Sequence, residues 1–531
     1  MPLYFFLLCF SLLVQYLFTV NYMFNINTMF LFQLLYMGIV LFSPATALEA
    51  VTGFPEWATI IITGLFATFY TAIGGMKAVI WTDVFQSFIM VAGLMSIVIM
   101  GCVDVGGIDK VWEIANDNNR IQFFEFNPDP TVRHSTWNLI FGSFVTWLYV
   151  FGVNQAVCQR FNSVPTLKAA RVSILLNIPG TLLLLGLTCL AGLVIFAYYA
   201  NKGCDPIGAG YITNPNQLLP YFVMDVLGVP GLPGLFVACL FSGSLSTLSS
   251  SLSAISANTW EDVLKLKFDH WPEYKKTIVT KCTVVIFGVL SIGMAYMAAG
   301  LGGTVVQASM SFSGSAGGAL LGIFILGAVF PWSNWIGAVS GGIIGVMFSM
   351  WISIGAYVSG RGRPGMLPTT VQHCPYNTTF NATYGQLNLT IPSRPLPPPA
   401  EGLNNLYTLS YLWFPSVGFL TTIIVGMIAS AITGFNNPAD MDPRYHMPIF
   451  DWMCGCLIPG KIKRFLNCNV NRSVLQYDDE QILDQKQQAR LNESPDKAKE
   501  VASPLYETNR TTQVTSDVDI NGHKIVQNTK L

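Results

Sequence analysis

Residues 79–102 read VIWTDVFQSFIMVAGLMSIVIMGC, and Asp83 is the only charged residue among them. An apolar run of about 20 residues is long enough to cross a bilayer as an α-helix. Residues 174–200 form a second such run, almost free of charge. Backbone groups in lipid must be hydrogen-bonded within the protein, so only helices or a closed barrel can span. The strict alternation of a barrel strand is absent, which predicts membrane-spanning helices.

The composition of the whole chain agrees with this interpretation. Of 531 residues, 52% are hydrophobic and 11% are charged, whereas soluble domains carry about 25% charged residues. The net charge of −1 gives no electrostatic case for a nucleic-acid partner. The five His and eleven Cys residues show no metal-ligand spacing, and most of the Cys are expected to be small apolar core residues.

We expect about eleven hydrophobic spans in an all-α, polytopic transmembrane domain over residues 1–433. The first 20 residues lack the basic start and cleavage site of a signal peptide, so a retained helix is predicted there. Residues 434–531 are polar and are predicted to form a cytoplasmic, largely disordered tail. The expected spans are 3–20, 28–48, 57–75, 79–102, 137–157, 170–199, 232–259, 277–299, 303–330, 334–357 and 408–433.

Basic residues in the short loops predict the orientation, because Lys and Arg collect on the cytoplasmic side. When the spans are threaded alternately, four groups of basic residues fall on one side. The groups are Lys77; Arg160, Lys168 and Arg171; Lys265, Lys267, Lys275 and Lys276; and Arg444, Lys461, Lys463 and Arg464.

The loop 358–407 is expected on the opposite, extracellular side, because it carries glycosylation sequons at Asn377, Asn381 and Asn388. Cys204 and Cys374 both fall in polar loops on this oxidising side. A disulfide between them is possible, but sequence cannot give the distance between them.

The span 232–259 contains FSGSLSTLSSSLS (241–253), with eight hydroxyl side chains between residues 242 and 253. One or two hydroxyls in a membrane helix are explained by hydrogen bonds to helical carbonyls or by close packing. Eight favour a site for a hard cation such as sodium, because hydroxyls and freed carbonyls can supply its oxygen ligands without a fixed charge.

Asp83 and two further spans supply other candidates. An acid inside the membrane is costly and is a functional candidate by default; the alternative is an interfacial acid that stays wet. The span 137–157 combines aromatic residues with Asn154 and Gln155, and the span 303–330 offers Gln307 and Ser309. By themselves these two patterns are more typical of core packing. No nucleophile, base and acid occur in a catalytic arrangement, so an enzyme is not expected.

Three segments together resemble the sodium/solute symporter family, in particular its branch of monocarboxylate, multivitamin and iodide symporters. They are TFYTAIGGMKAVIWTDVFQ (68–86), VFGVNQAVCQRF (150–161) and PGLPGLFVACLFSGSLSTLSSSLSAISANTWEDVLK (230–265), and MDPRY (441–445) is similar to a tail segment of this branch. The resemblance runs from about residue 30 to about residue 445.

The resemblance implies the leucine-transporter fold, an inverted-repeat helix bundle with its site where helices break near the midplane. Carried over by residue, it places sodium at Ser246, Thr247 and the Gly243 carbonyl, and links Asp83 to sodium passage. It places the substrate beside Trp147, Phe151, Gln155, Gln307 and Ser309. The family begins with helices that should precede residue 30, so the domain is expected to be N-terminally incomplete.

The function expected from these observations is sodium-coupled symport of a small solute across the plasma membrane, with sodium as co-transported ligand and no other cofactor. An organic anion such as a monocarboxylate is the first choice of substrate. Biotin or pantothenate is the second and iodide the third, and a non-transporting or inactive membrane protein is the alternative from another class. The sequence does not fix the oligomeric state.

Overall fold

The computed structural model describes residues 30, 33–212, 215–226, 231–299, 305–359, 367–374, 390–391 and 402–437. In this part of the chain, seven helices are long and apolar enough to cross a membrane, and the bent pair α4 (Ser143–Gly152) and α5 (Gln155–Asn162) adds an eighth. The expected span 3–20, the tail from 438 and the three sequons lie outside the described residues.

The seven helices lie in predicted spans, and one of them, α2, covers two of these spans. They are a helix Gln33–Thr52, α2 (Glu56–Val105), α6 (Leu167–Lys202), α8 (Leu232–Asn258), α10 (Glu273–Ala299), α12 (Trp335–Val358) and α13 (Phe414–Thr433). A further apolar helix, α11 (Val305–Val329), lies in the predicted span 303–330. Short connecting elements are α3 (Ile108–Asp117), the π-helices η1 (Asn138–Gly142) and η3 (Thr259–Leu264), η2 (Pro215–Gln217), α7 (Leu218–Val226), α9 (Lys265–Phe268), β1 (Thr369–Thr370), β2 (Thr390–Ile391), η5 (Gly402–Thr408) and η6 (Tyr411–Trp413).

The 50-residue helix α2 is folded on itself at Gly75. A straight helix of that length would extend about 75 Å, more than twice the thickness of a hydrocarbon core. Gly75 has φ 58° and ψ −163°, a conformation that only glycine adopts without strain. The predicted spans 57–75 and 79–102 are therefore the two arms of one hairpin.

Contacts with α8 show the reversal directly. The Tyr70 hydroxyl donates to the Leu245 carbonyl at 3.0 Å, from the first arm. The Cys239 thiol donates to the Met90 carbonyl at 3.5 Å, from the second arm. Both arms of α2 therefore lie against the same central stretch of α8.

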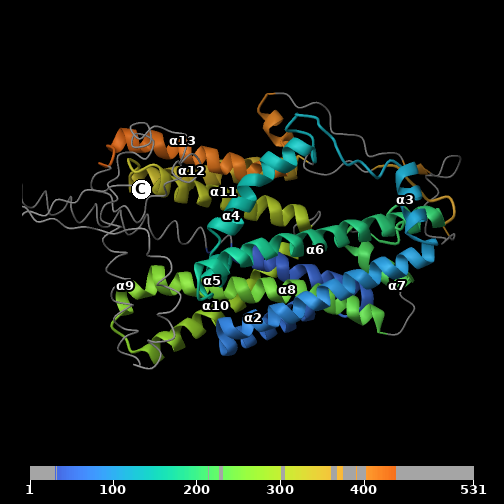
Figure 1. The fold of residues 1–531 in the computed structure, drawn as a ribbon, viewed down its shortest axis with the longest axis horizontal. Helices are drawn as coiled ribbons and strands as arrows, with labels where there is room; N and C mark the ends of the chain where they lie inside the picture. Colours follow the sequence, from blue (N-terminus) through green and yellow to red (C-terminus); the bar gives the residue numbers. More distant parts are fainter. Residues whose placement is uncertain are drawn as a thin grey trace, which may run out of the picture. The chain divides into compact units, whose positions relative to one another are not determined.

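The helices form two packed groups (Figure 1). In one group α2 packs against α6, α8 and α10, and helix Gln33–Thr52 crosses α10 so closely that a Cβ at Gly38 would meet Met294 at 2.7 Å. In the other group α11, α12 and α13 pack together with α4. The α12–α13 contact is a seam of small residues: a Cβ at Gly341 would lie 2.4 Å from the Thr422 carbonyl oxygen. Helix α5 contacts α8 and α6 of the first group and follows α4 of the second.

Candidate functional site

The hydroxyl run of α8 faces several neighbouring helices rather than one cavity. Some of its hydroxyls make the bonds that a purely structural role predicts. The donors and their acceptor carbonyls are Ser244 to Val40 at 2.8 Å, Thr247 to Gly243 at 2.9 Å and Ser249 to Ser246 at 3.1 Å. Ser256, three residues beyond the run, likewise donates to the Thr280 carbonyl at 2.9 Å. Structural bonding therefore accounts for part of the run, as expected for membrane helices.

Gly243 and Thr247, two of the predicted sodium ligands, lie on one turn of α8. The Thr247 hydroxyl donates to the Gly243 carbonyl, so the two oxygens are 2.9 Å apart. If that hydroxyl rotates its proton away, lone pairs of both oxygens become available to a cation. The absence of a side chain at Gly243 lets Met90 of the α2 second arm approach, with its sulfur 3.5 Å from where a Cβ would stand.

Asp83 is mostly buried, with 14% of its side chain exposed, so it is not simply a wet interfacial acid. Its Oδ2 accepts a hydrogen bond from Nη2 of Arg160 at 2.5 Å, and the same Nη2 donates to the Ser250 hydroxyl at 2.5 Å. The Ser246 side chain also faces the Asp83 carboxylate. Oδ1 of Asp83, the other carboxylate oxygen, accepts no hydrogen bond from the described residues. The structure thus brings together two predicted sodium ligands, Asp83 and Ser246.

Arg160 is the residue of this cluster that the sequence did not single out for a role in the site. In the sequence it counts only as one of the basic residues that mark a cytoplasmic loop. In the structure it joins three elements, because it lies on α5 and contacts α2 and α8. Its position in the same short helix as the candidate Gln155 was the one available signal.

Replacing Arg160 by Gln is expected to destabilise the protein by about 1–3 kcal/mol. Removing one partner of a buried pair costs about 3–5 kcal/mol, and the 41% exposure of the Arg160 side chain reduces this. The cost arises because the buried Asp83 carboxylate loses its charged partner. The double variant Arg160→Gln with Asp83→Asn should recover most of the loss, measured by thermal unfolding in detergent.

Arg171→Gln is the matched control, because Arg171 is exposed on α6 and lies among the same group of basic residues. Equal losses in Arg160→Gln and Arg171→Gln, or no recovery in the double variant, would show that the pair with Asp83 does not carry the effect.

A cavity of about 350 Å³ lies between the two helix groups. Gln155 lines it, as do its neighbours Asn154 and Ala156, at the point where α4 and α5 bend by 46°. The Asn154 side chain caps α5 by accepting from the Ala156 amide at 3.0 Å. Among the described lining residues none is Lys or Arg, and the polar ones are the amides Gln33, Asn154, Gln155 and Asn258, with Tyr149, Ser313, Glu261 and Asp262.

The other predicted substrate residues are not brought to this cavity. Trp147 and Phe151 stack on one another, with ring centroids 5.9 Å apart, and neither lines it. Ser309 is half-buried on α11 and is also absent from the lining. The side chain of Gln307 lies outside the described residues. Of the five predicted substrate contacts, the structure therefore places Gln155 at a cavity.

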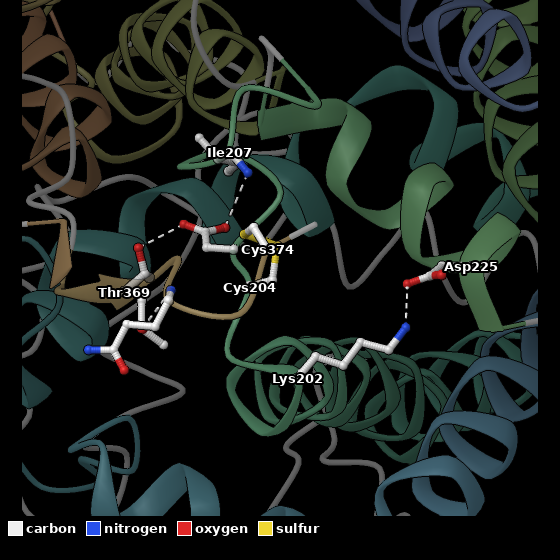
Figure 2. Close-up of a disulfide and its surroundings, with 9 residues drawn as sticks. Lys202, Cys204, Ile207, Asp225, Thr369 and Cys374 are labelled. Atoms are coloured by element: carbon white, nitrogen blue, oxygen red, sulfur yellow. Dashed lines mark hydrogen bonds and ion pairs between the residues drawn. A yellow bond between two sulfur atoms is a disulfide. The ribbon is translucent and has the colours of Figure 1, made fainter. Parts of the chain in front are cut away.

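The loops at one end of the helices are tied together by a disulfide between Cys204 and Cys374, whose Cα atoms are 4.8 Å apart (Figure 2). Asp205, the next residue, accepts from the Thr369 hydroxyl at 2.7 Å and from the Ile207 amide at 3.2 Å. Lys202 and Asp225 form an ion pair beside it at 3.0 Å.

A separate cleft is lined by Gly75, Gln159, Trp260 and Lys276. The predicted orientation puts the loops around this cleft on the cytoplasmic side and the disulfide-bearing loops on the extracellular side.

Two basic groups outside the spans have shifted pKa values. Burial lowers the pKa of His134 below its usual range, and the neighbouring Arg133 charge lowers it further. Its Nε2 lies 2.9 Å from the Tyr411 hydroxyl. Burial likewise lowers the pKa of Arg120, against an opposing effect of Asp205. The described part of the chain has no group of three His, Cys, Asp or Glu side chains placed to hold a metal ion.

Comparison with known proteins agrees with this architecture. Residues 17–345 match the model of the sodium:solute symporter family. The chain is 39% identical to sodium-coupled monocarboxylate transporter 2 of Mus musculus, over 79% of this chain and 67% of the relative. It is also 39% identical to the sodium-dependent multivitamin transporter of Oryctolagus cuniculus, over 89% of this chain and 74% of the relative. The chain is 40% identical to sodium-coupled monocarboxylate transporter 1 of Homo sapiens, over 82% of this chain and 72% of the relative.

A solved structure of a Na⁺-coupled sialic acid symporter in a substrate-bound outward-open state superposes with a TM-score of 0.57. It shares 23% sequence identity and covers 78% of this chain and 74% of its own, so the likeness concerns the fold. The predicted leucine-transporter-like bundle is thereby confirmed. Because the family model covers more than half of the chain, and relatives near 40% identity cover most of it, this protein belongs to the sodium:solute symporter family.

Proposed function

We propose that this chain is a plasma-membrane symporter in which sodium entry drives uptake of a small organic anion, most simply a short monocarboxylate. The observation that carries the proposal is the position of α8. It carries the hydroxyl cluster with Asp83 beside it, and it also lines the cavity through Ala254, Ile255 and Asn258. A cation on one side of this helix and a solute on the other would share a structural element.

The proposed sodium ligands are Ser246, Thr247, the Gly243 carbonyl and Asp83. Their oxygens are uncharged apart from one carboxylate, which suits a monovalent hard cation. Oδ1 of Asp83, which accepts no hydrogen bond from the residues that the structure describes, is the carboxylate oxygen proposed to bind the cation. Glycosylation at Asn377, Asn381 and Asn388, on the extracellular side, and a cytoplasmic tail over 434–531 remain part of the proposal.

The solute is proposed to bind at the bend between α4 and α5, with Gln155 as the first contact. A carboxylate there would meet side-chain amide donors and the amino-terminal end of α5, which carries a partial positive charge. Trp147, Phe151, Gln307 and Ser309 would have to approach the solute in another state of the cycle. Biotin or pantothenate, and then iodide, are the alternative cargoes.

Helix α5 offers a physical link between the two sites. It is eight residues long, or about 12 Å, with Gln155 at the cavity and Arg160 on Asp83. A cation that binds Asp83 weakens its bond to Arg160 and so frees α5 to move. Coupling requires that sodium and solute favour the same position of α5. The membrane potential adds about 2.3 kcal/mol per 100 mV for each net charge moved, so it drives uptake of a monocarboxylate only when more sodium ions than solute charges enter together.

Uptake of labelled lactate, biotin and iodide by cells that express the chain tests this function. We expect lactate uptake that disappears when choline replaces sodium. Ser246→Ala should raise the sodium concentration for half-maximal uptake several-fold, because one ligand oxygen is lost. Ser253→Ala, an α8 hydroxyl on the side of another cleft, is the control. Equal uptake in choline would contradict symport and would favour the alternative, a membrane protein that does not transport.

A further inference from the structure

A second hollow, of about 440 Å³, lies away from the transport cavity. It is bounded by the α2 turn at Gly75, by the end of α8 with η3, and by the first turns of α10. On α8 it uses Ser253, Ser256 and Ala257, whereas the transport cavity uses Ala254, Ile255 and Asn258. The two hollows therefore lie on different faces of one helix.

One face of α10 forms a wall of this cleft. Its lining residues recur every three or four positions, as expected for one side of a helix: Glu273, Lys276, Thr277, Thr280, Lys281 and Val284. Lys276 has its counter-charges in place, with Glu273 at 3.0 Å and Asp269 at 3.8 Å. The cleft is therefore basic only if Lys281 contributes an uncompensated charge.

Lys281 has no carboxylate within ion-pair distance among the residues that the structure describes. It lies two turns inside α10, a helix apolar and long enough to span, and its side chain is exposed. A lysine near the end of a spanning helix extends its flexible stem so that the ammonium reaches the headgroup level, where anionic phosphate groups lie. Its environment calls for a negatively charged partner from outside the described chain.

The rest of the lining suits the headgroup and first acyl carbons of a lipid. Ala72, Met76 and Val284 are apolar, and Trp260 is a residue type that collects at membrane interfaces. The Thr71 side chain also lines the cleft, and its buried hydroxyl has no partner in the described part of the chain. A hydroxyl with a free proton and an ammonium that line the same cleft are groups that can bind phosphate oxygens.

We propose that this cleft binds the phosphate of an anionic phospholipid, with the Lys281 ammonium as its main contact. The lipid belongs to the leaflet at the Gly75 end of the helices, which is the cytoplasmic leaflet in the proposed orientation. Its binding would brace the α2 hairpin turn against α10. Lipid binding at this cleft does not depend on transport. The lipid test can therefore fail while the proposed symport stands, and symport can be disproved while the lipid site stands.

The test uses the full chain in nanodiscs of phosphatidylcholine, alone or with phosphatidylglycerol, followed by detergent exchange. Phospholipid that remains bound is measured by mass spectrometry, and thermal unfolding is measured in parallel. We expect the wild type to retain phosphatidylglycerol and to unfold at a higher temperature when it is present. Lys281→Gln should lower the apparent affinity about tenfold, the equivalent of one charge-assisted contact.

Lys275→Gln is the matched control, because Lys275 is an exposed lysine near the start of the same helix that does not line the cleft. Lys281→Arg keeps the charge and should keep the lipid, which also covers the case in which Lys281→Gln does not fold. Equal retention by wild type and Lys281→Gln would overturn the proposal, as would equal losses in both Lys→Gln variants. If inorganic phosphate alone displaces the lipid, the phosphate group does not have to come from a lipid, and the lipid part of the proposal is wrong. If phosphatidylglycerol changes neither lipid retention nor the unfolding temperature of the wild type, the site itself is wrong.

Discussion

Thr247→Pro is expected to abolish sodium-driven uptake while leaving part of the protein at the cell surface. Proline at this position removes the backbone N–H that bonds to the Gly243 carbonyl in the helix, and its ring clashes with that carbonyl. It also removes the hydroxyl, which lies 2.9 Å from the same oxygen. The change therefore removes one proposed sodium ligand, the Thr247 hydroxyl, displaces a second, the Gly243 carbonyl, and kinks the helix beside Ser246.

The measurement is sodium-dependent uptake of labelled lactate, normalised to the amount of protein labelled at the surface. Thr247→Ser is the control, because it keeps both the backbone bond and the hydroxyl, and it should retain most of the activity. An interior proline costs about 3 kcal/mol or more, so a lower surface level is expected as well. Normal uptake per surface molecule in Thr247→Pro would remove α8 from the sodium site.

Gly318→Leu is expected to prevent the chain from folding. Gly318 lies where α11 crosses the start of α13, and a Cβ there would be 2.0 Å from the Pro415 carbonyl oxygen and 2.6 Å from its carbon. Both atoms belong to the backbone, so no side chain can rotate away. Overpacking of a core costs about 1–3 kcal/mol when side chains can adjust, and here the two helices must separate.

Gly327→Leu is a control on the same helix, because nothing lies within 4 Å of a Cβ at that position. We expect it to behave as the wild type in size-exclusion chromatography and thermal unfolding, whereas Gly318→Leu elutes as aggregate. Since the total stability of a protein is about 5–15 kcal/mol, a cost of several kcal/mol is enough. A monodisperse Gly318→Leu protein with unchanged unfolding would contradict the close crossing of α11 and α13.

The two arms of α2 show how far apolar patterning reaches. The runs 57–75 and 79–102 were predicted as separate spans, and Gly74 and Gly75 stand between them. The structure merges them into one hairpin, with the reversal at Gly75 alone. Patterning locates the arms because each must be apolar over a bilayer thickness, and a glycine marks where the backbone can turn.

Arg160 shows that sequence patterning does not predict contacts between distant residues. In the sequence it is a basic residue beside a span, which predicts a cytoplasmic loop. Its bonds to Asp83 and Ser250 join residues 77 and 90 positions apart. The same holds for Cys204 and Cys374, whose pairing was only a possibility until the chain between them was folded.

The sequence by itself determined the class of protein, the family, and the spans within the described residues. Long apolar runs without the alternation of a barrel strand are stable in lipid only as helices, and local motifs can be recognised without distances. The tertiary structure alone decided which polar groups meet. Gln155 reaches a cavity while Trp147 and Phe151 stack on one another, and Asp83 meets an arginine as well as the serines of α8. A side chain's partner depends on how its helix is rotated and on which neighbouring element packs against it, and the sequence of that helix alone determines neither.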